Sequence, residues 1–390
     1  MRSPLLLAAA LIALGCSDRT PSGISDNQLK PLDAPPFGVA SPPGVTVLTW
    51  NVYYGTDPTP LLTAPADQVP FVAAGVWGLV QQTNFPARAG ALAQAIAARR
   101  PHLVGVEEAA IYRLQRPGDL AFGGTQPATQ VVYDFLALLA DSLAARGLHY
   151  VIAAADSTTD VEVPVITGVD PATGIPTFDD VRQTDRDAVL VRADVQIANP
   201  QHAKYGAFIP ISIGGAQAGV YEGWSSIEAT IGGRTIRFID THLETQDARP
   251  VQLGQAQELL ALLQNEPLPT ILAGDFNSDV FGADPSRATP SYGMITGAGF
   301  ADSWLRPGLV PAGLTCCQSE TLDNPVAAFD QRIDFIFTRN MPPHTQVIGR
   351  DIVGADPADR TAGGLWPSDH GGVVATFVMP PARLGEVASQ

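Results

Sequence analysis

The stretch LPTILAGDFNSDV, Leu268 to Val280, runs an apolar segment straight into the tetrapeptide GDFN. Residues 270–273 form a short apolar run, which is typical of a buried strand. Because side chains alternate along a strand, Asp275 and Asn277 would project from the same side if the extended geometry persists. A carboxylate and a carboxamide at the exit of a buried strand favour a functional site over a place in the core.

Strand and helix patterns alternate along most of the chain. Short apolar runs predict strands at residues 45–52, 102–108, 187–192, 270–273, 332–338, 346–353 and 373–378. Gly232 and Gly233 separate two β-rich arms and predict a hairpin. Helical spacing of apolar residues predicts helices at 86–100, 131–147 and 249–264. This mixture predicts an α/β protein in which packed mixed sheets are flanked by helices.

One apolar segment, Ala66 to Asn84, stands between the first predicted strand and the first predicted helix. Its Val69, Val72, Val76 and Val80 recur at helical spacing. Two interpretations stay open: a helix packed on the core, or a lid that contacts an apolar substrate.

Composition favours one globular catalytic domain with a tail. The 390 residues are 45% hydrophobic and 16% charged, and the net charge is -16. This acidity supplies no long-range attraction for a polyanion, although a local metal site can override it. The basic residues are scattered, and Arg182, Arg186 and Arg192 come nearest to forming a group. A nucleic acid partner is therefore unsupported by the charge pattern.

The N-terminus MRSPLLLAAALIALGC predicts export. A single charge at Arg2 precedes an apolar run that is too short to span a bilayer, so residues 1–15 resemble a signal peptide. The ending ALGC resembles a bacterial lipobox, which would make Cys16 the lipidated first residue of an exported, membrane-anchored lipoprotein, periplasmic or at the cell surface. The alternative is an ordinary signal peptide in which Cys16 is incidental. Residues 16–44 then form a flexible tether, 45–380 the catalytic domain and 381–390 a C-terminal tail.

The other cysteines, Cys316 and Cys317, are adjacent. A disulfide between neighbours is strained, but an exported protein meets an oxidising compartment. A disulfide and two free thiols both remain open.

Polar residues recur at the ends of the predicted strands. They are Asn51, Glu107, Glu108, Asp240, His242, Asp275, Asn277, Asp334, Asp369 and His370. Carboxylates and carboxamides are hard oxygen ligands that suit Mg²⁺ or Mn²⁺, and histidines add proton transfer near neutral pH. If these side chains converge, they suit attack of water on a phosphorus centre.

The order of WNV, GVEE, THLE, GDFN, RIDFIF and SDHGG resembles the endonuclease/exonuclease/phosphatase superfamily from about Val45 to Val378. This superfamily includes deoxyribonucleases, abasic-site endonucleases, inositol polyphosphate 5-phosphatases and bacterial sphingomyelinases. The resemblance implies a four-layered α/β sandwich with the active site at one end of two packed sheets. It also implies an Mg²⁺- or Mn²⁺-dependent hydrolase.

The resemblance assigns metal-site roles to three residues. Glu108 matches the metal-binding glutamate, Asn51 the asparagine beside it, and Asp369 the neighbouring acid. Glu107 is a rival to Glu108, because this chain has EE where the family usually has QE. Strand alternation would put the two on opposite faces, so only one should reach the metal.

The remaining roles concern the phosphate. Asp275 matches the residue that orients or activates water, and Asn277 a donor to the phosphate. His370 matches the histidine that stabilises the transition state or transfers a proton, and Asp334 the carboxylate that holds its ring. His242 matches a second histidine of the deoxyribonuclease and sphingomyelinase branches.

Together these features predict an exported, metal-dependent phosphoester hydrolase, and a phosphodiesterase rather than a monoesterase. The substrate we expect is a small or lipid phosphodiester, and the protein a monomer that meets the membrane through its N-terminal lipid. One alternative is an extracellular, deoxyribonuclease-like endonuclease. Another, of a different class, is a surface lipoprotein that binds without catalysis.

Overall fold

The computed structural model describes residues 44–213, 215–305 and 312–380. The predicted signal peptide, Cys16, nearly all of the tether and the tail at 381–390 lie outside these residues. Within them, no helix is both long and apolar enough to cross a membrane.

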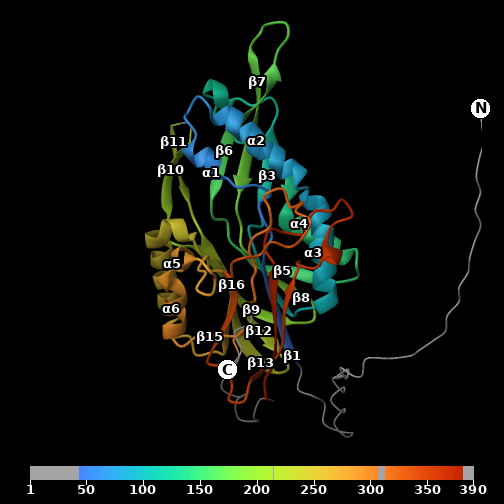
Figure 1. The fold of residues 1–390 in the computed structure, drawn as a ribbon, viewed down its shortest axis with the longest axis vertical. Coiled ribbons are helices and arrows are strands. Elements are labelled where there is room, and N and C mark those ends of the chain that lie inside the picture. Colours follow the sequence, from blue (N-terminus) through green and yellow to red (C-terminus); the bar gives the residue numbers. More distant parts are fainter. Residues whose placement is uncertain (1–43, 214, 306–311, 381–390) are drawn as a thin grey trace, which may run out of the picture. The chain divides into compact units, whose positions relative to one another are not determined.

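Two six-stranded mixed sheets form the centre of the fold (Figure 1). The first has the order β17-β18-β1-β2-β8-β5. Its strands are β1 Gly44–Asn51, β2 Leu103–Glu107, β5 Tyr150–Ala155, β8 Ala188–Arg192, β17 Gln346–Val353 and β18 Gly372–Val378. The second has the order β15-β16-β14-β13-β12-β9. Its strands are β9 Gln196–Lys204, β12 Gly223–Ile231, β13 Arg234–His242, β14 Thr270–Asp275, β15 Ala301–Asp302 and β16 Asp334–Arg339.

The two sheets pack face to face on an apolar core. Val45 and Val47 from β1 meet Phe238 from β13 and Ile271 from β14, and all four are fully buried. Burying an aliphatic or aromatic side chain of this size stabilises the fold by about 1.5–3 kcal/mol. The strongly apolar runs of these strands therefore explain why they are central.

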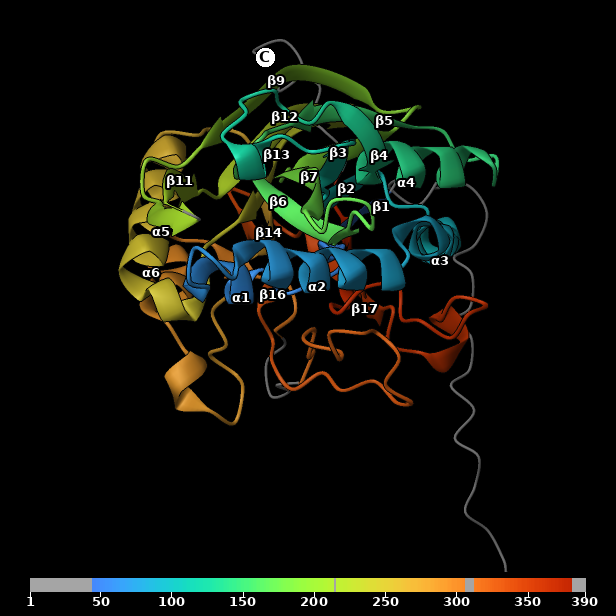
Figure 2. The same cartoon turned by 90° about the horizontal axis from the view of Figure 1, so that it is seen from above.

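Helices cover the outer faces of both sheets. They are α3 Phe85–Arg99 and α4 Phe135–Ala144 over the first sheet, and α5 Arg249–Leu263 and α6 Pro290–Gly297 over the second. Figure 2 shows the two helix pairs on opposite sides. Leu92 of α3 and Leu139 of α4 are buried in one outer cluster, and Leu259 of α5 in the other. This confirms the predicted sandwich of packed mixed sheets flanked by helices.

A third sheet, which the sequence patterns did not predict, has the order β4-β3-β7-β6. Its strands are β3 Ile111–Gln115, β4 Gln130–Asp134, β6 Asp160–Val169 and β7 Pro176–Thr184. A separate ribbon pairs β10 Ile209–Ile213 with β11 Ala216–Val220. The predicted helix at 131–147 begins only at Phe135, because the residues before it pair with β3. The predicted start of this helix, at residue 131, was therefore wrong.

The apolar segment between Ala66 and Asn84 is largely helical. Helix α2, Val69–Gln82, follows the short α1, Thr59–Thr63, and lies against β6 (Figure 2). Ala73, Trp77 and Val80 of α2 are buried in the core. The interpretation as a helix packed on the core is therefore confirmed. Four short 3-10 segments complete the fold: Leu120–Phe122, Gln246–Ala248, Pro285–Arg287 and Pro357–Asp359.

Candidate active site

The carboxyl ends of four central strands meet at one edge of the two sheets. Strands β1 and β2 are parallel and end at Asn51 and Glu107. Strands β13 and β14 are also parallel and end at His242 and Asp275. Asp334 begins β16 opposite Asp275 in the antiparallel register. Topology therefore brings the predicted residues together from distant parts of the chain.

Asn51 connects the two sheets at this edge. Its Nδ2 donates to Glu108 Oε1 at 2.8 Å and to Asp275 Oδ2 at 3.2 Å. The second oxygen of Glu108 accepts from the backbone N–H of Tyr54 at 2.9 Å. Glu108 thus lies with the predicted site residues.

Glu107 turns the other way. It is fully buried, and its Oε1 accepts from Thr49 Oγ1 at 2.6 Å. Alternation along a strand explains this only in part, because β2 ends at Glu107 and Glu108 adopts a left-handed φ of 58°. That turn is what directs the Glu108 carboxylate toward Asn51.

The GDFN turn is built around a close approach of the backbone. A side chain at Gly274, where φ is 144°, would place its Cβ 1.8 Å from the carbonyl oxygen of Thr241. Asn277 has φ 49°, and its N–H donates to Asp275 Oδ1 at 2.9 Å. The extended geometry therefore does not persist; a turn held by the Asp275 side chain brings Asn277 to the site instead.

His370 and Asp334 form a close pair. His370 Nδ1 lies 3.0 Å from Asp334 Oδ2 and 3.8 Å from Asp275 Oδ2. Burial by itself lowers the pKa of His370, but Asp334 and Asp369 outweigh it and raise that pKa well above its usual value. Because Nδ1 faces Asp334, Nε2 is the ring atom left for another partner.

His242 lies on the other side of Asp275. Its Nε2 is 3.7 Å from Asp275 Oδ2 and 3.2 Å from Asn277 Nδ2. Burial lowers the pKa of His242 to about 3, and the charge of His370 adds to this effect. The site thus holds one imidazole that favours its charged form and one that favours its neutral form.

Comparison with known families matches residues 48–370 to the Endonuclease/Exonuclease/phosphatase family. The chain belongs to this family. Members of the family are hydrolases that act on phosphoester bonds, so membership indicates a phosphoester hydrolase. None of the curated proteins compared matches the sequence.

Solved structures are similar to this chain. An endonuclease/exonuclease/phosphatase from Beutenbergia cavernae is 19% identical with a TM-score of 0.50, over 86% of this chain and 72% of that one. A D. rerio TDP2 humanized by 14 mutations is 15% identical with a TM-score of 0.48, over 86% of this chain and 98% of that one. At these identities the likeness concerns the fold alone.

The family's divalent cation fits the oxygen groups beside Asn51. Glu108 and Asp369 are only partly buried, whereas Glu107 has no exposed surface. Burial and the charge of the neighbouring Asp369 raise the pKa of Glu108 to about 8, and a bound cation would offset both effects. Asn51 presents Nδ2 to the carboxylates while its Oδ1 accepts from the N–H of Tyr53, so its part as a ligand stays a prediction.

Arg88 of α3 is a positioning residue that the sequence patterns did not single out. Its fully buried guanidinium donates to the carbonyl oxygens of Val52, Tyr53 and Pro367 at 2.6–3.0 Å. The carbonyls of Val52 and Tyr53 directly follow Asn51 in the chain, and that of Pro367 directly precedes the SDH segment. Arg88 lies four residues before Leu92 on the buried face of α3. The sequence did contain a signal for this role, because Arg88 is a charged residue in line with the apolar residues on the buried face of the helix.

Cys316 and Cys317 are joined in a disulfide. Cys316 also forms an isolated backbone β-bridge with His370, which places the disulfide beside this histidine.

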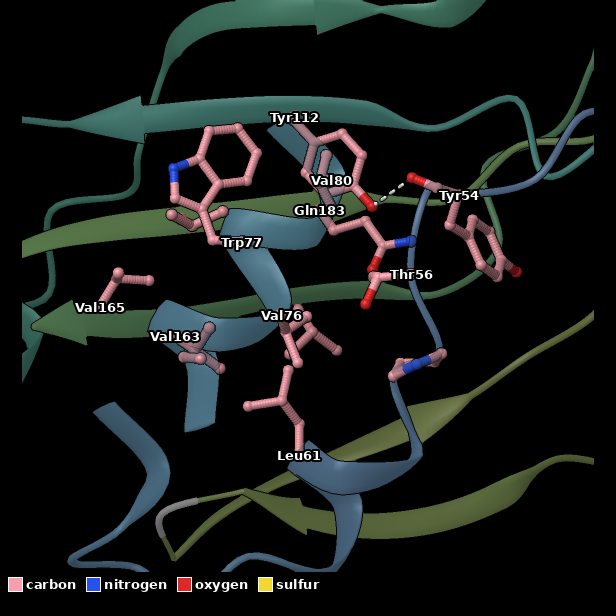
Figure 3. A pocket seen from close by; sticks show the side chains of 14 residues that line it. Tyr54, Thr56, Leu61, Val76, Trp77, Val80, Tyr112, Val163, Val165 and Gln183 are labelled. Atoms are coloured by element: carbon pink, nitrogen blue, oxygen red, sulfur yellow. Dashed lines mark hydrogen bonds between the residues drawn. The ribbon is translucent and has the colours of Figure 1, made fainter. Parts of the chain in front are cut away.

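An apolar pocket opens next to the segment that follows Asn51 (Figure 3). It has a volume of about 50 Å³, and its walls include Val76, Trp77 and Val80 of α2 with Val163, Val165 and Val181 of the third sheet. Tyr54 and Thr56 line its polar end, where the Tyr112 hydroxyl donates to the carbonyl oxygen of Tyr54 at 3.0 Å. Since the N–H of Tyr54 contacts Glu108, one residue joins the pocket to the predicted metal site.

Proposed function

We propose that the chain is a phosphodiesterase that uses Mg²⁺ or Mn²⁺ to hydrolyse a small or lipid phosphodiester. The observation that carries this proposal is the convergence of Glu108, Asp275 and the His370–Asp334 pair at one sheet edge. A bound cation would supply charge stabilisation on the phosphate oxygens.

The chain's own residues divide the remaining work. Burial and the neighbouring Asp334 raise the pKa of Asp275 well above its usual value, which suits a group that takes a proton from the attacking water. His370, held by Asp334, offers a positive charge or a proton through Nε2. Asn277 and His242 contact each other and would hold phosphate oxygens on the opposite side.

Two features support a substrate that is not a polyanion. The three arginines nearest to a group in the sequence each pair with an aspartate: Arg182 with Asp160, Arg186 with Asp134 and Arg192 with Asp194. The positive charges of these arginines are therefore partly neutralised by aspartates of the same chain. The apolar pocket beside Tyr54 would accept an alkyl or acyl group of a substrate whose phosphate lies at Glu108.

The metal requirement is tested with a chromogenic phosphodiester. Activity should disappear in EDTA and return with Mg²⁺ or Mn²⁺, and Glu108→Gln should weaken this rescue far more than the matched control Glu107→Gln. Full activity after exhaustive chelation would remove the metal from the proposal. No turnover of any phosphoester with metal present would favour the alternative of a binding lipoprotein.

Substrate class is tested by comparing sphingomyelin, a chromogenic diester and plasmid DNA. Deleting Ala66 to Asn84 would remove core residues, so a substitution that fills the pocket is the sharper test. Val76→Phe should impair the lipid substrate more than the chromogenic one. Val72→Phe, one turn away on the same helix and outside the pocket, is the matched control. Efficient cleavage of DNA without turnover of lipid or small diesters would instead support the endonuclease.

The proposed location is the membrane, through a lipid on Cys16, and it rests on the N-terminal sequence. Cys16→Ser should release the protein from the membrane fraction or leave an unprocessed precursor. Normal cleavage and equal membrane association of the variant would make Cys16 incidental.

A further inference from the structure

A second group of possible ligands lies behind His242, on the side of the ring away from Asp275. Asp187 precedes β8, Glu222 precedes β12, and His242 ends β13. His242 Nδ1 is 3.4 Å from Glu222 Oε2 and 4.0 Å from Asp187 Oδ1. All three residues are at least 95% buried.

Three polar atoms in this group lack a hydrogen-bond partner among the described residues: His242 Nδ1, Glu222 Oε2 and Asp187 Oδ2. Buried carboxylates of this kind are normally paired with a cation or bound to a metal. The nearby basic groups are engaged elsewhere, since Lys204 donates to the carbonyl oxygen of Thr158 and Arg186 pairs with Asp134. The group therefore has excess acceptor capacity that no side chain in the described part of the chain satisfies.

The separations match those between ligands of one metal ion. Atoms that each lie about 2.1 Å from a cation are roughly 3–4.2 Å apart, and the distances of 3.4 Å and 4.0 Å from His242 Nδ1 to Glu222 and Asp187 fall in this range. The ligand atoms of the three residues all lie within 4.8 Å of one another. An imidazole with two carboxylates suits a first-row transition metal such as Mn²⁺ or Zn²⁺ better than Mg²⁺.

We propose that Asp187, Glu222 and Nδ1 of His242 bind a divalent transition-metal ion that is separate from the cation at Glu108. The ion would neutralise the buried carboxylates and hold the His242 ring. With Nδ1 on the metal, the ring proton is on Nε2, which faces Asp275 Oδ2 at 3.7 Å. Nε2 then no longer accepts from Asn277 Nδ2, which lies 3.2 Å away and keeps its bond to the carbonyl oxygen of Leu243 at 2.9 Å. His242 would then act at the phosphate as a fixed, neutral donor.

The test is equilibrium dialysis of the full chain against Mn²⁺, with bound metal measured directly. Mn²⁺ suits this test because it prefers nitrogen and oxygen ligands, and Cys316 and Cys317 are joined in a disulfide and offer no thiolate. The wild type should bind one equivalent more than Glu222→Gln and one more than Asp187→Asn. In a Glu108→Gln background, where the predicted catalytic cation is weakened, Glu222→Gln should remove the remaining Mn²⁺.

Glu107→Gln is the matched control, because it neutralises a buried glutamate outside the group and should leave this second equivalent in place. Both test substitutions keep the side-chain volume and place a neutral amide in the buried group, so the metal-free variants should remain folded by circular dichroism. Added Mn²⁺ should raise the Tm of Glu108→Gln but not of the Glu108→Gln, Glu222→Gln double variant.

Equal Mn²⁺ binding with and without Glu222→Gln would overturn the proposal. Glu222 would then only accept a hydrogen bond from His242, which the glutamine oxygen can also do. Because the measurement reads binding rather than turnover, its failure is separate from any failure of the proposed phosphodiesterase activity.

Discussion

The two buried histidines, His370 and His242, lie 3.8 Å and 3.7 Å from Asp275 Oδ2, and their pKa values shift in opposite directions. His370 Nδ1 is 3.0 Å from Asp334 Oδ2, within hydrogen-bond distance, and its pKa is raised well above the usual value despite burial. His242 Nδ1 is 3.4 Å from Glu222 Oε2 without a hydrogen bond, and burial lowers its pKa to about 3.

The contrast shows that proximity to an acid does not by itself charge a buried imidazole. Burial raises the pKa of Glu222 well above its usual value, and the neighbouring acids Glu244 and Asp185 raise it further. Glu222 therefore does not supply the negative charge that would keep a proton on His242. Asp334 does this for His370. Residue type and burial are alike at the two positions, so the partner carboxylate decides the charge.

The largest effect is expected from His370. His370→Ala removes the charged imidazole, and loss of a positioned acid or base typically reduces the rate about 10²- to 10⁴-fold. Turnover of a chromogenic diester measures this, with circular dichroism as the check on folding. An activity close to wild type would show that the Asp334-paired imidazole is not the proton-transfer group.

Asp334 should act through His370. The double change Asp334→Asn with His370→Ala should therefore cost little more than His370→Ala alone, since residues that act as a unit are not additive. The four kcat values of this cycle provide the measurement. Losses that multiply would mean that the two side chains work independently.

His242 should contribute less, because a neutral ring offers a hydrogen bond rather than a charge. His242→Ala should reduce kcat/KM roughly tenfold, the worth of one hydrogen bond near a charged group. A loss of kcat/KM as large as that of His370→Ala would contradict the proposed difference between the two rings.

The smallest effect concerns acid stability in EDTA. In the folded state, His242 stays neutral until the pH falls to about 3. In the unfolded chain, it gains a proton below about pH 6.5. Its contribution to the unfolding free energy is present above about pH 6.5 and falls by up to about 1.4 kcal/mol per pH unit below it. His370 has the opposite sign, since its raised pKa stabilises the fold at low pH and this stability is lost as the pH rises through that value.

Urea unfolding of wild type, His242→Gln and His370→Gln at about pH 7 and about pH 5 tests these signs. The wild type should lose more stability on acidification than His242→Gln. It should lose less than His370→Gln. Identical pH dependence in all three proteins would contradict the assignment of charge to the two rings.

Much of the site was predictable because its residues belong to local patterns. Asn51, Glu108, His242 and Asp275 each follow or end an apolar run, and parallel strands bring such ends together, whereas His370 precedes the apolar run of β18, which is antiparallel to β1. The third sheet was not predictable in this way. Strands β6 and β7 contain exposed and partly buried residues such as Val169 and Arg182, so apolar alternation is weak there.

The sequence by itself determined most of the central strands, the order of their polar endings and the family, because a buried strand needs an unbroken apolar run and Gly274 is required where a Cβ would strike Thr241. Only the tertiary structure decided that Glu108 rather than Glu107 faces Asn51, that Arg88 holds the loops of the site, and that Glu222 meets His242. Those outcomes depend on left-handed turns, on burial and on distances between segments far apart in the chain. Charge in a buried site is set by such distances, and no local pattern of residues contains them.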